Sequence, residues 1–188
     1  MEPRPVFPRL TGSAEVSVRP ALPSDAADVA RVQELAWRSA PAGAVPGAVL
    51  ESWDGAAVAA SWAAAVTDPP SPRHEVLVAL DGDQVVGFAA VAPAEPQDDG
   101  PVTELVLVLV EPRWGRRGHG SRLLAAVADR ATAAGAVRLV AWLAELDTVT
   151  AGFLESAGWD RDGWVRTLDT GADPLREVRW HTLLGGGA

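Results

Sequence analysis

Residues 110–122, VEPRWGRRGHGSR, hold the densest group of chemically active side chains in the sequence. Four arginines and three glycines fall in this short segment, between a strand-like run and an apolar helix pattern. Glycines let a ligand approach the backbone, and the first N–H groups of a helix have no intrahelical partner. The helix dipole adds partial positive charge at the same point. The segment therefore predicts a phosphate or pyrophosphate site, in preference to a surface loop of solvated arginines.

Two common phosphate motifs do not fit this segment. A dinucleotide-binding fingerprint requires a third glycine where the chain has Leu123, and the surrounding βαβ repeat is missing. A nucleotide P-loop requires a lysine after its last glycine, and the chain contains no lysine. The anion must therefore be held by a different kind of loop.

The elements on either side of the segment must position it. TELVLVLV (103–110) is an unbroken aliphatic run, which predicts a strand buried on both faces in the middle of a sheet. After the segment, the helical spacing of apolar residues predicts a helix that ends at Ala134-Gly135, and VRLVAWL (137–143) predicts the next strand. The apolar stripe of this helix consists of Leu123, Leu124, Val127, Ala128 and Ala131.

The remaining patterns complete a mixed α/β domain with a central sheet. We expect a single domain over residues 15–184, a flexible lead-in over 1–14 and a frayed tail over 185–188. The other expected elements are a strand at 16–19, a helix that Ser24 or Asp25 caps and that stops before Pro41, a helical pattern from Val49 to Ala64, a hairpin of strands 75–80 and 84–91 around Asp81-Gly82, a helix from Asp147 or Thr148 to Glu155, and two final strands, the second at 175–184.

Three segments together resemble a known family. The junction reads Val110-x-Pro112 and then RGHGSRLL (117–124), which resembles the acyl-CoA-binding motif of the GNAT superfamily of N-acyltransferases. The segment at 16–40 looks like that family's first strand and helix, and DTVTAGFLESAGW (147–159) looks like its Asn-x-x-Ala-x-x-Phe-Tyr-x-x-x-Gly-Phe segment. The resemblance covers about residues 15–184 and implies a GNAT-like mixed central sheet of six to seven strands flanked by about four helices.

This resemblance implies an N-acetyltransferase that uses acetyl-CoA. The backbone amides of Arg117–Arg122 would cradle the CoA pyrophosphate, and strand 103–110 would bond the pantetheine arm where it parts from strand 137–143. The arginine or glutamine that usually opens the motif falls on Gly115, and Arg116 stands where a glycine is common. The implied cofactor-binding residues are Leu109, Val110, Arg116, Arg117, Gly118, His119, Gly120, Ser121, Arg122 and Phe153.

Acyl transfer to an amine needs a group that takes a proton from the amine. Glu104 lies eight residues before Pro112, where many members of the family carry that glutamate, so we predict it as the catalytic base. An ordinary solvent-facing carboxylate is the alternative. The family's general-acid tyrosine is replaced by Leu154, and the chain has no tyrosine, so water or the product ammonium would protonate the thiolate. A non-catalytic acyl-CoA-binding or regulatory module is therefore the alternative function.

Trp37 and Trp53 fall on the two N-terminal helical patterns, which in the family border the acceptor pocket. With Arg38, they are the predicted substrate-binding residues, since a pocket of tryptophans and charges can hold an amine by cation–π and ionic contacts. Core packing is the alternative role for these tryptophans. The acceptor would be a small-molecule amine, an aminoglycoside-like drug, a polyamine or a peptide N-terminus, and the net charge of −9 favours a cation.

The amino-acid composition limits the kinds of partner that the protein can bind. The net charge argues against nucleic-acid binding, and the longest aliphatic run, 105–110, is far shorter than the roughly 20 residues of a membrane helix. The chain has no cysteine, which excludes disulfides and an acyl-thioenzyme intermediate and is compatible with a cytoplasmic protein. Three scattered histidines predict no metal site. A homodimer through a terminal strand edge is compatible with the fold, and a protein-interaction domain that binds another anion is a further rival.

Overall fold

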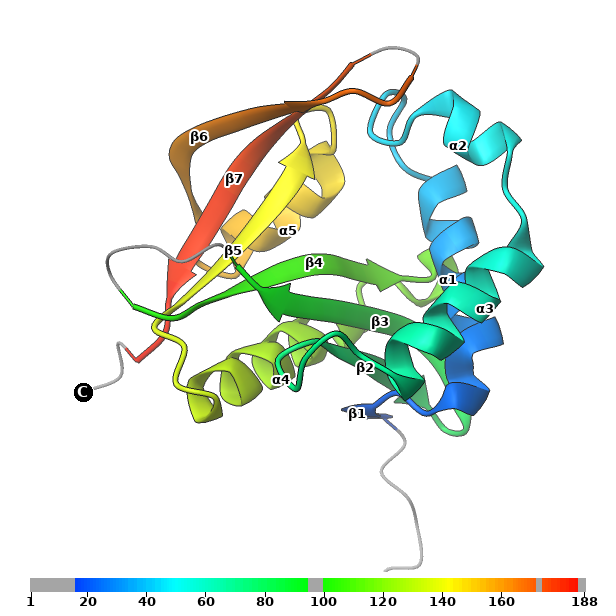
Figure 1. The fold of residues 1–188 in the computed structure, drawn as a ribbon, viewed down its shortest axis with the longest axis horizontal. Coiled ribbons are helices and arrows are strands. Elements are labelled where there is room, and N and C mark those ends of the chain that lie inside the picture. Colours follow the sequence, from blue (N-terminus) through cyan, green and yellow to red (C-terminus); the bar gives the residue numbers. More distant parts are fainter. Residues whose placement is uncertain (1–15, 95–99, 172–173, 186–188) are drawn as a thin grey trace, which may run out of the picture.

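The computed structural model describes residues 16–94, 100–171 and 174–185, which form a seven-stranded sheet with helices on both faces (Figure 1). The expected lead-in, residues 1–14, lies outside the described residues, as do residues 186–188 of the expected tail. The strand order is β1-β2-β3-β4-β5-β7-β6. In chain order the elements are β1 (Val16–Pro20), η1 (Pro23–Asp25), α1 (Ala26–Arg38), α2 (Gly47–Glu51), α3 (Gly55–Thr67), β2 (Glu75–Asp81), β3 (Gln84–Pro93), β4 (Val102–Val110), η2 (Pro112–Trp114), α4 (His119–Ala133), β5 (Arg138–Ala144), α5 (Thr148–Ser156), β6 (Asp160–Leu168) and β7 (Leu175–Leu183).

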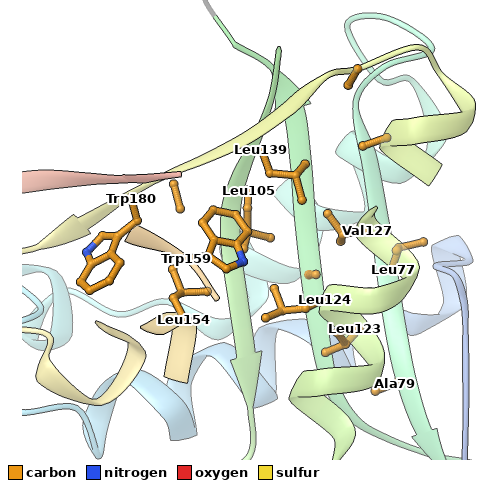
Figure 2. Close-up of a cluster of buried hydrophobic side chains, with 14 of the residues drawn as sticks. Leu77, Ala79, Leu105, Leu123, Leu124, Val127, Leu139, Leu154, Trp159 and Trp180 are labelled. Atoms are coloured by element: carbon orange, nitrogen blue, oxygen red, sulfur yellow. The ribbon is translucent and has the colours of Figure 1, made fainter. Parts of the chain in front are cut away.

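Two apolar clusters attach the helices to the sheet. On one face, Leu123, Leu124 and Val127 of α4 point toward Leu105 and Leu139 of the sheet, as Figure 2 shows. The stripe expected on this helix is therefore confirmed. On the other face, α1 and α3 pack over β2 and β3, and the members of this second cluster are Val29, Val32, Val76, Val78, Val85, Phe88 and Ala90.

The central strand β4 pairs with β5 along only part of its length. The parallel register joins Val102 to Arg138, Thr103 to Leu139 and Glu104 to Val140, and it then stops. The prediction that this strand parts from its neighbour is confirmed. The prediction that it is buried on both faces is wrong beyond Leu105, because the parting exposes the strand; Val106 is 45% exposed.

The second helical pattern is two helices rather than one. α2 ends at Glu51, and α3 begins after Asp54, whose carboxylate accepts hydrogen bonds from the N–H groups of Ala56 and Ala57. An aspartate at this position is a strong helix N-cap, so it starts a new helix where apolar spacing alone suggests a continuous one.

Side-chain hydrogen bonds also bear on where other helices begin. Asp147 caps α5, as expected, by accepting from the N–H of Thr150. Asp25 does not cap α1 with its side chain; its carboxylate accepts from the N–H of Leu22 and pairs with Arg19.

The hairpin between β2 and β3 is also shifted by one residue from the expected turn. Asp81 pairs with Gln84, so the two central turn residues are Gly82 and Asp83, and Gly82 takes a φ of 57°. Glycine supplies that left-handed conformation at no steric cost.

No helix among the described residues has the length and apolarity needed to cross a membrane.

Candidate functional site

A cavity of about 1040 Å³ opens where β4 and β5 part. Its floor and one wall are residues 105–110 of β4 and 141–144 of β5, and it reaches from the loop before α4 to the end of α1 and the start of α2. Figure 1 shows β5 and β7 at the left of the view and α1 and α2 at the right, with β4 running from the first group toward the second. The cavity therefore joins the predicted anion site to the N-terminal helices that the sequence assigns to the acceptor.

The loop before α4 presents free backbone donors to this cavity. Gly118 precedes the helix with a φ of 81°, and the first helical hydrogen bond runs from the N–H of Arg122 to the carbonyl of Gly118. The N–H groups of the first helical turn have no partner within the helix, and His119, Gly120 and Ser121 all line the cavity. This arrangement favours an anion.

Two glycines make room that a side chain would fill. A Cβ on Gly118 would lie 2.8 Å from Nη1 of Arg122, which donates to the carbonyl of Arg117. A Cβ on Gly120 would lie 3.0 Å from Cζ of Phe153 on α5. The start of α4 therefore lies close to its own arginine and to α5, and the positive φ at Gly118 also favours glycine. The residues present fit a CoA pyrophosphate, because the backbone is bare where a phosphate would contact it.

Arg116 occupies a backbone conformation that glycine prefers. Its φ is 60°, whereas Gly115 beside it has a φ of −58°. The left-handed region costs a residue with a Cβ about 1–2 kcal/mol. Arg116 therefore holds a strained backbone conformation, and the residue lines the cavity.

Three side chains, Arg117, Trp114 and His119, pack against one another at the loop before α4. The guanidinium of Arg117 lies 4.7 Å from the centre of the Trp114 ring, and the edge of Trp114 meets the His119 ring at 6.0 Å. His119 is fully buried, with Nε2 3.6 Å from a carboxylate oxygen of Asp81. Burial holds the pKa of His119 below its usual value.

The predicted contribution of His119 is therefore limited to its backbone. The motif predicted His119 as a cofactor-binding residue, and nothing in the sequence indicated that its ring packs beneath the loop. The ring is buried because α4 packs on β2 and β3, and this packing depends on residues far away in the sequence.

The arginines of the junction divide into two groups. Arg113 pairs with Glu111, a buried carboxylate that also pairs with Arg31 at 2.5 Å. Its charge is thus already balanced by the protein. Arg116, Arg117 and Arg122 have no carboxylate partner within the described residues, and Arg116 is the one of these three that lines the cavity.

Glu104 lies at the point where β4 and β5 separate. It is half-buried rather than fully solvated, and burial raises the pKa of its carboxyl. Arg166 opposes this effect, and the neighbouring negative charge of Glu177 adds to it. Glu104 does not itself line the cavity, whereas Leu105 and Glu177 do.

Glu177, Arg166 and Trp142 form a group that the sequence analysis missed as a site. Nε of Arg166 lies 2.5 Å from Oε2 of Glu177, and its guanidinium lies 4.5 Å from the centre of the Trp142 ring. Glu177 is 9% exposed, and both it and Trp142 line the cavity. The three residues come from β7, β6 and β5, so only the pairing of these strands brings them together.

The three predicted acceptor residues do not act as one group. Trp37 lines the cavity and meets the ring of Trp53 at 5.6 Å, edge to face. Trp53 lies behind it and does not line the cavity. Nε of Arg38 lies 2.9 Å from a carboxylate oxygen of Glu34, and Arg38 does not line the cavity either.

The position of the missing tyrosine is part of the core. Leu154 is fully buried in the cluster under α4 and α5. The hydroxyl-bearing residues Thr150 and Ser156 line the cavity nearby, and the Ser156 hydroxyl donates to the carbonyl of Phe153 at 2.7 Å. The side chain at position 154 therefore offers no acidic proton.

Comparisons with known proteins agree with this geometry. The model of the acetyltransferase (GNAT) family matches residues 29–159. Similar solved structures include YncA from Salmonella typhimurium with its cofactor acetyl-CoA, at 19% identity and a TM-score of 0.67, covering 93% of this chain and 97% of that one. PaiA N-acetyltransferase from Thermoplasma acidophilum, in complex with coenzyme A, matches at 14% identity and a TM-score of 0.67, covering 90% and 99%.

A third similar structure is ribosomal-protein-alanine N-acetyltransferase from Brucella melitensis. It matches at 21% identity with a TM-score of 0.68, covering 89% of this chain and 99% of that one. No protein with a curated description matches the sequence. The solved structures confirm the fold, which extends over almost the whole of each matched chain.

Proposed function

Because the chain belongs to the acetyltransferase (GNAT) family, we propose that it transfers the acetyl group of acetyl-CoA to a primary amine by direct attack in a ternary complex. One observation carries the proposal: a single cavity joins a helix N-terminus suited to pyrophosphate with a strand parting that begins at a half-buried glutamate. The absence of cysteine excludes an acyl-thioenzyme intermediate and thereby favours direct attack by the amine.

The chain supplies two kinds of contact for the cofactor. The N–H groups at the start of α4, with Arg116 and Arg117, would hold the pyrophosphate. Beyond Glu104, the edge of β4 that faces β5 has no strand partner, so its backbone groups are available to the pantetheine arm. Leu109 and Val110 lie at the end of this edge, next to the anion site.

Glu104 would act as the base on the acceptor amine. Burial raises the pKa of its carboxyl, so this group binds a proton at higher pH than a solvated glutamate and is the better base near neutrality. Since Glu104 does not line the cavity, the amine proton would reach its carboxylate through a water molecule. Arg166 and Glu177, which affect the Glu104 pKa in opposite directions, would set its value.

Acetyl-CoA, when bound, supplies an activated acetyl carbonyl and a thiolate leaving group. Leu154 cannot donate a proton to that leaving group, and the chain has no tyrosine. The proton would come from water or from the ammonium of the product. A thiolate is a good leaving group, so this step does not need a strong protein acid.

Release of CoA can be measured with a thiol-specific chromogenic reagent. The protein contains no cysteine, so the signal comes from CoA alone. We expect thiol release that depends on an added primary amine, with intersecting initial-velocity lines typical of a ternary complex. Glu104→Gln should lower kcat roughly 100-fold near neutral pH and remove the basic group from the pH profile. Glu155→Gln, which changes an exposed glutamate on α5, is the matched control.

A second function is favoured by one observation, the apolar and fully buried Leu154 at the position of the family's acid. A non-catalytic acyl-CoA-binding module would be stabilised by acetyl-CoA but would release no thiol with any amine. Parallel initial-velocity lines, or equal kcat for the wild type and Glu104→Gln, would instead contradict the proposed mechanism while leaving acetyl transfer in place.

A further inference from the structure

The cavity has a second end, away from the loop before α4. One side of this end is formed by the last turn of α1, the following segment and the start of α2, and the other side by β5 and β7. With the anion site at the first end, this second end is where an acceptor would meet the acetyl group. Its lining therefore selects the acceptor.

The lining on the helix side is almost entirely apolar. Trp37 stands on the wall, and its ring is held edge to face against Trp53 at 5.6 Å. A second indole, Trp142, faces the cavity from β5, with the guanidinium of Arg166 at 4.5 Å from its ring centre. The residues between α1 and α2 that complete this wall include Pro41, Ala44, Val45, Pro46 and Val49.

The carboxylates on the lining are already engaged. Within the parts of the chain that the structure describes, the carboxylates that line the cavity are Asp147 and Glu177. Asp147 accepts from the N–H of Thr150, and Glu177 pairs with Arg166 at 2.5 Å. An acceptor with several ammonium groups would place charges against apolar walls without a free carboxylate to pair them, and unpaired charges are costly to remove from water.

We infer that the acceptor is a monoamine carried on a flat apolar body, such as an arylalkylamine, and that Trp37 and Trp142 determine this specificity. The inference rests on the proposed function and names the substrate class of the same site. Aromatic rings gain both apolar burial and favourable edge contacts from indoles. The charge of the whole chain favours cations, but the residues that would contact the acceptor favour an apolar amine.

The test compares amines at a fixed, saturating concentration of acetyl-CoA. The probes are phenylethylamine, ethanolamine as a small amine without an apolar body, spermidine and kanamycin as polycations, and a short peptide that begins with alanine. We expect kcat/KM for phenylethylamine to exceed that for ethanolamine by about 100-fold, as the burial of a phenyl ring predicts. The polycations should be poorer still.

Three variants test which side chains cause the preference for phenylethylamine. Trp37→Ala and Trp142→Ala should each raise KM for phenylethylamine roughly tenfold, with smaller effects on ethanolamine and no effect on acetyl-CoA affinity. Trp164→Ala removes an indole that is 62% exposed and outside the cavity, and it should leave all constants unchanged. Thermal melts and acetyl-CoA binding are measured for each variant, so that a fall in activity caused by unfolding would be recognised.

The outcomes separate the inference from the function on which it rests. Turnover of spermidine, kanamycin or the peptide equal to or better than that of phenylethylamine overturns the inference, while acetyl transfer to amines stands. A phenylethylamine KM that is unchanged in both cavity variants also overturns it. No thiol release with any amine, although acetyl-CoA binds, overturns the proposed function and the inference together.

Discussion

Replacing Gly120 with glutamate would test the anion site most directly. The new Cβ would lie 3.0 Å from Cζ of Phe153, so the ring must move by a few tenths of an ångström. The carboxylate would then occupy the start of α4, where a phosphate is expected to bind. A negative charge at a helix N-terminus is itself favourable by about 0.3–1 kcal/mol, so the unliganded variant should melt within about 2–4 °C of the wild type.

The effect should be seen in the response to acetyl-CoA. At 100 times its dissociation constant, a ligand adds about 2.7 kcal/mol to the free energy of unfolding, which raises Tm by roughly 5–10 °C for a chain of this size. If the glutamate weakens binding about 100-fold, the same ligand concentration adds only about 0.4 kcal/mol, or about 1 °C. The expected difference is several times the precision of a thermal melt.

Gly152→Glu is the matched control. Gly152 is exposed on α5, a Cβ there would meet no atom within 4 Å, and the residue does not line the cavity. This variant carries the same added charge and should keep the full acetyl-CoA shift. A full shift in Gly120→Glu would refute the placement of the pyrophosphate at α4, and the loss of the shift in both variants would show that net charge alone is responsible.

Three other predictions rest on contacts of Trp114, Asp25 and His119 in the structure. Trp114→Ala removes the ring under Arg117 and should weaken acetyl-CoA binding roughly three- to tenfold by titration calorimetry, whereas Trp114→Phe should retain most of the affinity. Arg19 holds the pKa of Asp25 below its usual value, so Asp25 stabilises the fold above about pH 4 and this contribution is lost at lower pH; Asp25→Asn should cost about 1–3 kcal/mol at pH 7 by urea unfolding. Burial lowers the pKa of His119, so stability should fall as pH drops below about 6.5, and His119→Leu should reduce that fall in urea midpoints.

Each of these predictions has a contrary result. Equal acetyl-CoA affinity in Trp114→Ala and the wild type would mean that Arg117 does not depend on the ring for its position. A stability difference for Asp25→Asn that persists undiminished below about pH 3 would show that the carboxylate charge is not its origin. An unchanged acid slope in His119→Leu would assign the pH dependence to other groups.

Local chemistry made much of this protein predictable from the sequence. A strand, a glycine-rich turn and an apolar helix stripe identify the anion site over residues 103–135, because glycine conformation and helix caps depend on neighbours within a few residues. Asp147 and Gly158 mark the limits of α5 for the same reason. The mixed α/β fold follows from these local patterns in their order along the chain, whereas acetyl-CoA as the ligand came from the family resemblance.

The features that the sequence did not predict depend on strand register and on packing between distant residues. Residues 105–110 of β4 form an unbroken aliphatic run, yet β4 pairs with β5 only as far as Glu104, because the register of two strands depends on the packing of the whole sheet. The pairing of β7 with β5 and with β6 brings Glu177, Arg166 and Trp142 together, although they come from three strands. His119 became a buried support for the same reason, since packing of α4 on β2 places its ring beneath the loop. The sequence by itself predicted an anion site before the helix at 119–133, and only the tertiary structure determined which side chains line the cavity beside it, because those contacts join residues far apart in the chain.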